Sequence, residues 1–241
     1  MLAPSKDEKK AKPDVLALLR SSGVFGVLPE DALAALAASA RIESHKLTTL
    51  VYAAGEPMLW LRLVLTGSIE LSASSVAGAE VIVAEVPPGQ WMPWYGCIAD
   101  RPAPHDLYCS AGSTCLAVSA ARVREVARAH PRLYLPILLE MGARGEQLLE
   151  WTMQSVLLKP EQRLAKLLHL LLKNQGVQRG TGVLLLTQTR LARLAGCSRQ
   201  SLSLMIKGLK QRQLIEGRYG ELRIADVAAL QAFASENLEE A

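Results

Sequence analysis

The spacing of hydrophobic residues changes along the chain, and each change predicts a different kind of structure. Residues 1–14 are polar and rich in Lys, a composition typical of a disordered tail. Apolar positions then recur at helical spacing in two segments, Val15–Ser21 and Glu30–Ala40. From Arg41 onward, short apolar or alternating runs replace the helical pattern. The N-terminal part is therefore predicted to place two helices before a region of β structure.

Six runs after Arg41 have the length and composition of β-strands. They are separated by turn sequences such as residues 54–57 and 87–89, which contain Gly and Pro. Short strands at this spacing are typical of a β-barrel or a sandwich-like roll. The predicted strands are Thr49–Tyr52, Trp60–Leu65, Ser68–Ser72, Glu80–Val86, Leu107–Ser110 and Cys115–Val118.

Helical periodicity returns at Ala120–Ala129 and again after Pro131. In the second of these helices, one register has alternating steps of four and three, as in a coiled-coil seam of fewer than three heptads. We interpret this seam as a dimer interface; the alternative is a helix packed on its own barrel. The seam residues are Leu138, Gly142, Gly145, Leu149, Thr152 and Val156.

A break at Lys159-Pro160 marks a domain boundary, because Pro is favoured at an early position of a new helix. That helix is predicted over Glu161–Lys173, with a broad apolar face. The predicted organisation is a tail at 1–14, a β-roll domain at 15–130, a long helix that carries the seam at 131–158 and a C-terminal helical domain at 159–241.

The stretch Gln188–Lys207 has the spacing of a helix-turn-helix. Two short helices that meet at a steep angle need a small residue at their contact, and Ala192 provides it. The tight turn needs a residue that tolerates positive φ, and Gly196 provides that. Thr187 and Ser198 are placed to cap the two helices. One local rule is broken, because Arg190 stands where a capping box has Glu or Gln.

The second helix of this unit has one apolar and one polar face, as a helix lying in the major groove of DNA needs. Arg199 near its N-terminus can bridge the O6 and N7 acceptors of guanine, and Gln200 can pair with adenine. Other side chains are better placed to contact phosphates, which fixes register without reading sequence. The predicted backbone contacts are Thr189, Arg193, Ser198, Lys207 and Lys210. The alternative is a helical hairpin with a solvated basic face.

Residues 214–224 read as a β-hairpin with a Gly-rich tip, followed by a helix over Val227–Ala234 that Asp226 caps. The hairpin is predicted to be a wing, with Arg218 near the DNA backbone. A hairpin with a purely structural role is the equal alternative for that contact.

The distribution of charge supports a nucleic-acid partner for the C-terminal part. Residues 160–224 contain twelve Lys and Arg and three acidic residues, a net charge of +9, whereas the remaining residues carry −5. The four Cys show no metal-ligand spacing, and the four His are scattered without the His-x-His pair of a cupin-type metal enzyme. We therefore expect no cofactor and no metal site, and we do not expect the protein to be an enzyme. The alternative function is that of a cupin-like β-barrel enzyme with a helical C-terminal tail. Without a secretory signal or a long apolar segment, the protein is expected in the cytoplasm, away from the membrane.

The order of these parts, together with the runs Arg163–Leu168 and Thr187–Ser201, resembles the CRP/FNR family of bacterial transcription regulators. The resemblance covers roughly Val15–Leu230. It implies an α+β fold in which a double-stranded β-roll is joined by a dimerisation helix to a winged helix-turn-helix. It further implies a homodimer that binds inverted-repeat DNA and contacts RNA polymerase. The match to the family's recognition helix adds Ser203 to Arg199 and Gln200 as a base reader.

The resemblance makes the β-roll at 15–130 a sensor domain and the domain at 159–241 a DNA-binding domain. The sensor domain departs from the cyclic-nucleotide-binding members of this family. The Glu expected for ribose is replaced by Pro93 or Trp94, and the Arg expected for phosphate is replaced by Ala103. The polar pair expected for the base corresponds to Leu148 and Leu149. Cyclic AMP is therefore not the expected effector.

The identity of an effector, or whether one exists, stays open from the sequence. The aromatic residues Trp91, Trp94 and Tyr95 either cage an apolar effector or plug the mouth of the barrel. His105 stands where the phosphate site of the family lies. With Leu148 and Leu149, these residues form the candidate effector pocket.

Overall fold

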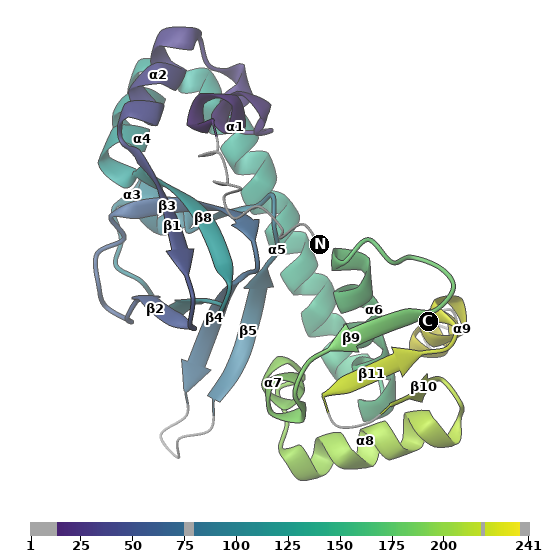
Figure 1. Cartoon of the computed structure of the whole chain (residues 1–241). Coiled ribbons are helices and arrows are strands. Elements are labelled where there is room, and N and C mark those ends of the chain that lie inside the picture. Colours follow the sequence, from purple (N-terminus) through teal and green to yellow (C-terminus); the bar gives the residue numbers. More distant parts are fainter. Residues whose placement is uncertain (1–13, 75–79, 218–219, 237–241) are drawn as a thin grey trace, which may run out of the picture.

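A computed structural model of the chain describes residues 14–74, 80–217 and 220–236 (Figure 1). These residues form two hydrophobic cores, one in an N-terminal β-roll and one in a C-terminal helical domain, connected by a long helix. The predicted tail lies outside the described residues except for Asp14. Among the described helices, none has the length and apolar character needed to cross a lipid bilayer.

Two short helices precede the roll, as their periodicity predicts. Helix α1 spans Val15–Ser21 and is capped by the Asp14 carboxylate, which accepts hydrogen bonds from two backbone N–H groups. Helix α2 spans Glu30–Ala38. It ends before the predicted Ala40, because residues from Ala40 onward pair with a strand of the roll.

The β-roll consists of two antiparallel four-stranded sheets, with strand orders β1-β8-β3-β6 and β2-β7-β4-β5. Buried residues from both sheets form the N-terminal core together with α1 and α2. The strands are β1 (Ala40–His45), β2 (Thr49–Tyr52), β3 (Trp60–Thr66), β4 (Ile69–Ser74), β5 (Glu80–Val86), β6 (Trp91–Met92), β7 (Asp106–Cys109) and β8 (Ser113–Ser119).

Three elements of the roll were not predicted from the pattern. Strand β1 alternates only weakly between buried and exposed positions, and β6 has only two residues. Helix α3 (Trp94–Ala99) has six residues, too few for helical periodicity to be recognised.

Helix α4 (Ala120–Ala129) leads into the long helix α5 (Tyr134–Leu157), which runs from the roll to the C-terminal domain (Figure 1). One side of α5 packs on the roll: Ile137 is buried, and the Glu140 carboxylate accepts a hydrogen bond from the Trp91 backbone N–H. Arg144 donates to the Trp91 carbonyl oxygen. The opposite side of α5 is exposed.

The C-terminal domain packs helices against a small three-stranded sheet of order β10-β11-β9. Its β9 strand was not predicted; it adds to the predicted hairpin by pairing antiparallel with β11. The elements are α6 (Pro160–Asn174), β9 (Gly182–Leu185), α7 (Gln188–Leu194), α8 (Arg199–Gln211), β10 (Ile215–Glu216), β11 (Glu221–Ile224) and α9 (Val227–Ser235).

Candidate nucleic-acid interface

The helix-turn-helix forms with the local devices that the sequence predicts. The Thr187 hydroxyl accepts a hydrogen bond from the Arg190 N–H at 3.2 Å, and the Ser198 hydroxyl accepts one from the Ser201 N–H at 3.1 Å. Gly196 adopts a φ of 60°, the left-handed conformation that the turn requires. Asp226 likewise caps α9. These predictions are confirmed.

Buried apolar residues hold α7 against α8 and thereby set which face of α8 is outward. Leu191 and Ala192 on α7 are buried, as are Leu202, Met205 and Ile206 on α8. Because these positions on α8 share one side, the polar residues between them face solvent. All three predicted base readers, Arg199, Gln200 and Ser203, are exposed.

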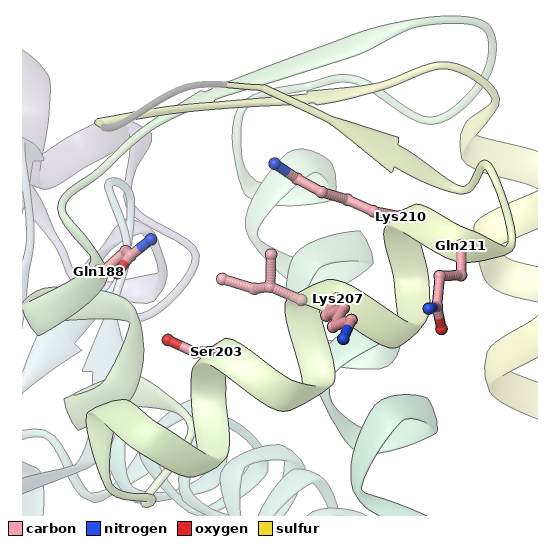
Figure 2. Close-up of a pocket in the computed structure, with 6 residues that line it drawn as sticks. Gln188, Ser203, Lys207, Lys210 and Gln211 are labelled. Atoms are coloured by element: carbon pink, nitrogen blue, oxygen red, sulfur yellow. The ribbon is translucent and has the colours of Figure 1, made fainter.

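A groove lies between this outward face and the start of α7 (Figure 2). Ser203, Lys207 and Lys210 line it from α8. Gln188, the first residue of α7, faces them, and Gln211 completes the rim. Ile206 also lines the groove. Around this apolar side chain lie amide, hydroxyl and ammonium groups, which can donate hydrogen bonds to phosphate oxygens or base edges.

Two of these lining residues, Gln188 and Gln211, were missed by the sequence reasoning. Gln188 follows the Thr187 cap directly, so the cap itself signals that its side chain lies at the helix start. Gln211 lies four residues after Lys207, on the same helical face, in a last turn that the predicted segment did not include.

Several predicted backbone contacts already have partners within the chain. Lys210 Nζ donates a hydrogen bond to the Gly217 carbonyl oxygen at 2.9 Å and so connects α8 to the residue that follows β10. Ser198 uses its hydroxyl as a cap. Thr189 and Lys207 are exposed. Arg218 lies outside the described residues.

Arg193 lies toward the β-roll rather than toward solvent. Its Nη2 is 3.4 Å from the Ser72 hydroxyl of β4. Its neighbour Arg190 is ion-paired with Glu70 of β4 and Glu85 of β5. The structure thus separates the cations of α7, which contact the roll, from those of α8, which face outward.

The aromatic residues of the candidate effector pocket divide into buried and exposed groups. Trp91 and Trp94 are buried and pack with Phe25, with ring centroids 4.9 and 5.7 Å from that of Phe25. This arrangement fills the interior of the roll with side chains. Tyr95 is 63% exposed, and His105 is also exposed.

The remaining pocket candidates, Leu148 and Leu149, lie on the exposed side of α5, with 55% and 60% of their surface accessible. The seam register shares this side: Leu138 and Val156 are 66% and 79% exposed. Within the described part of the chain, no atom of another element lies within 4 Å of the place that a Cβ on Gly142 or Gly145 would take. The seam is therefore uncovered by the chain's own roll.

Comparison with known proteins places the C-terminal domain in a family. The family model of the Crp-like helix-turn-helix domain matches residues 162–233, a range that includes α7 and α8. A search of curated proteins found no match to the sequence.

Solved structures resemble the chain along most of its length. A putative transcriptional regulator of the crp/fnr family from Eubacterium rectale is 16% identical, with a TM-score of 0.74, covering 88% of this chain and 97% of its own. The cyclic-di-GMP-responsive global regulator CLP of Xanthomonas campestris is 20% identical, with a TM-score of 0.69, covering 81% and 99%. FixK2 from Bradyrhizobium japonicum is 14% identical, with a TM-score of 0.68, covering 80% and 96%. Residues 162–233 thus form a Crp-like helix-turn-helix domain, and the chain as a whole has the fold of CRP/FNR-family transcription regulators.

Proposed function

We propose that this protein regulates transcription by binding inverted-repeat DNA as a homodimer, without depending on cyclic AMP. The observation that carries the proposal is the outward face of α8, where Arg199, Gln200 and Ser203 are exposed above a buried apolar face. A helix held in this way can enter the major groove with its N-terminal residues at the base edges. A regulator of this kind acts in the bacterial cytoplasm, where the chromosome and RNA polymerase are.

Dimer formation is supported by the uncovered side of α5. Its exposed Leu and Val side chains follow the seam register, and a second copy of the helix would remove them from water. Because each chain carries one recognition helix, a twofold dimer presents two helices to two half-sites. We expect half-site centres about 10–10.5 bp apart.

Independence from cyclic AMP is supported by the residues at the three recognition positions. Pro93 is the residue before the first turn of α3, and Ala103 is buried with its backbone hydrogen-bonded to residues 55 and 56. Leu148 and Leu149 are apolar. These side chains offer neither a carboxylate for ribose, a cation for phosphate, nor a polar pair for the base.

The proposal is tested by selecting bound duplexes from a random-sequence DNA library. Wild type should enrich an inverted repeat with the expected spacing. The Arg199→Ala/Gln200→Ala variant should lose preference at specific positions of each half-site, because each bidentate base contact contributes about 1–3 kcal/mol of discrimination. The matched control Gln231→Ala changes an exposed Gln on α9 and should select the wild-type motif. Recovery of no common motif by wild type would refute the proposal.

A further inference from the structure

The hairpin of β4 and β5 carries two glutamates that face one another. Glu70 and Glu85 are direct partners in the antiparallel register. Like charges placed opposite each other destabilise a sheet unless a cation lies between them. Here the cation comes from the other domain: Arg190 Nη2 is 2.7 Å from a carboxylate oxygen of each glutamate.

The same surface of the β4–β5 hairpin packs against the C-terminal domain, beside α7. The register between β4 and β5 shifts after Leu71, so that Ser72 pairs with Ile82 instead of Val83. Such a bulge redirects the side chains that follow it. Ile82 is buried and belongs to the hydrophobic core cluster of the C-terminal domain. In Figure 1, α7 lies beside this hairpin, and Ser72 is the residue that Arg193 contacts.

Burial strengthens the ion pairs between Arg190 and the two glutamates, because a charge that is shielded from water interacts more strongly with its partner. The Glu70 side chain is only 7% exposed, whereas that of Arg190 is 40% exposed. Burial raises the pKa of Glu70, the positive charge of Arg190 opposes that rise, and Glu85 adds to it. The ion pair therefore joins the buried Glu70 carboxylate of the β-roll to the partly exposed Arg190 of α7.

We propose that Glu70 and Glu85 form an intramolecular clamp that withholds Arg190 and Arg193 of α7 from DNA phosphates. This inference rests on the proposed function. The glutamates occupy the guanidinium group of Arg190, and Ser72 beside Glu70 contacts that of Arg193. Both guanidinium groups are phosphate ligands by chemistry, so DNA phosphates compete with these contacts. The clamp also accounts for Arg190 at a capping-box position, because neither Glu nor Gln there would supply a positive charge between the two carboxylates.

The clamp controls affinity and leaves base preference unchanged. The outward face of α8 remains exposed while α7 is held. Opening the clamp adds phosphate contacts from α7 without altering the base readers. Each added contact steepens the dependence of log K on log salt by about 0.9, so the gain in affinity is largest at low salt.

The test compares DNA binding by Glu70→Gln/Glu85→Gln with that of wild type, on the duplex that wild type selects. Glutamine keeps the shape of each side chain and removes the charge. The variant should bind more tightly at low salt, with a slope steeper by about one to two and an unchanged motif. The matched control Glu125→Gln removes a surface charge from α4, where Glu125 pairs with Arg122, and should behave as wild type.

Hydrogen exchange provides a readout that does not depend on DNA. In the free protein, amides of α7 and β5 should exchange faster in Glu70→Gln/Glu85→Gln than in wild type or Glu125→Gln. Unchanged exchange would show that the glutamates do not hold the two domains together. Weaker binding, or an unchanged salt slope with wild type still selecting its motif, would show that the contact does not oppose DNA binding. A wild type that selects no motif refutes the proposed function instead.

Discussion

Gly196 shows how a single residue fixes the geometry of the interface. Its φ of 60° is unfavourable for residues with a Cβ, whereas no described atom lies within 4 Å of the place that a Cβ there would take. Gly196→Ala should therefore cost about 1–2 kcal/mol through conformation alone. The control Gly23→Ala has equally open space at an ordinary φ. Urea denaturation should show a loss for the first variant only; equal stabilities would contradict this explanation.

Residues on the outward face of α8 should differ in what they contribute to DNA binding. Gln200→Ala should flatten base preference at one position of each half-site, because it removes a base contact. Lys207→Ala should weaken binding to all sequences alike and reduce the salt slope by about one. Binding isotherms on sequence variants at several salt concentrations distinguish the two effects. An unchanged preference for Gln200→Ala would exclude it as a base reader.

The Glu43–Arg62 pair inside the roll makes stability depend on pH. Arg62 Nε lies 2.7 Å from the Glu43 carboxylate, and their side chains are 5% and 13% exposed. Burial acts to raise the pKa of Glu43, but hydrogen bonds and charge from Arg62 and Arg41 outweigh it and lower the pKa below 4.5. The resulting stabilisation is present above pH 4.5 and is lost as pH falls through the lowered pKa.

Glu43→Gln should therefore reduce the free energy of unfolding at pH 7. Between pH 7 and pH 3, the variant should lose less stability than wild type does. Removing one partner of a buried pair costs about 3–5 kcal/mol, because the other charge is left buried. The double variant Glu43→Gln/Arg62→Met removes both charges and should be more stable than the single variant. Denaturation midpoints measured from pH 7 to pH 3 check both expectations. A single variant as stable as wild type would show that the pair contributes nothing.

Local rules accounted for the caps at Thr187 and Ser198 and for the turn at Gly196, since each depends on neighbours within a few residues. They could not account for Arg190. Its carboxylate partners are 120 and 105 residues away in the sequence, and only the tertiary structure brings them together. The residue that departs from the capping-box rule is therefore the one that makes the long-range contact.

The proposed homodimer depends on the exposed side of α5. Leu149→Lys/Val156→Lys places two charges in the proposed seam and should shift the protein from dimer to monomer. Leu47→Lys is the matched control, because Leu47 is 77% exposed and lies outside α5. Sedimentation velocity at micromolar concentration measures the change. A dimer that survives the double substitution would place the interface elsewhere.

Elements with strong periodicity were predictable, and short elements that depend on a partner strand were not. The bounds of α1 and α4 match their predicted ranges. Strands β6 and β9 have two and four residues and are defined by pairing with β3 and β11. The sequence around such strands carries little signal, because the hydrogen bonds that define them come from another segment.

The protein as a whole should not respond to cyclic AMP. Calorimetry with millimolar cyclic AMP should show no saturable heat, and DNA affinity should be unchanged by the nucleotide. A ligand shifts a conformational equilibrium only through its different affinity for the two states. Micromolar binding that is abolished by Arg101→Ala would show that Arg101 replaces the missing cation near Ala103.

The order of the parts was predictable because each part has its own periodicity. Their mutual placement was not. Ile82 illustrates the reason: it lies in a predicted strand of the roll, yet it is buried in the C-terminal core. The candidate effector residues show the same limit, since the sequence grouped Trp91 and Trp94 with Tyr95, whereas two are core residues and one is exposed.

The most direct test of dimeric, inverted-repeat recognition is the mass of the protein–DNA complex, measured by sedimentation on the selected duplex. Two chains should bind one duplex that contains both half-sites, and affinity should fall strongly when either half-site is scrambled. One chain bound to a single half-site, with the same affinity for the intact and the scrambled duplex, would contradict this expectation.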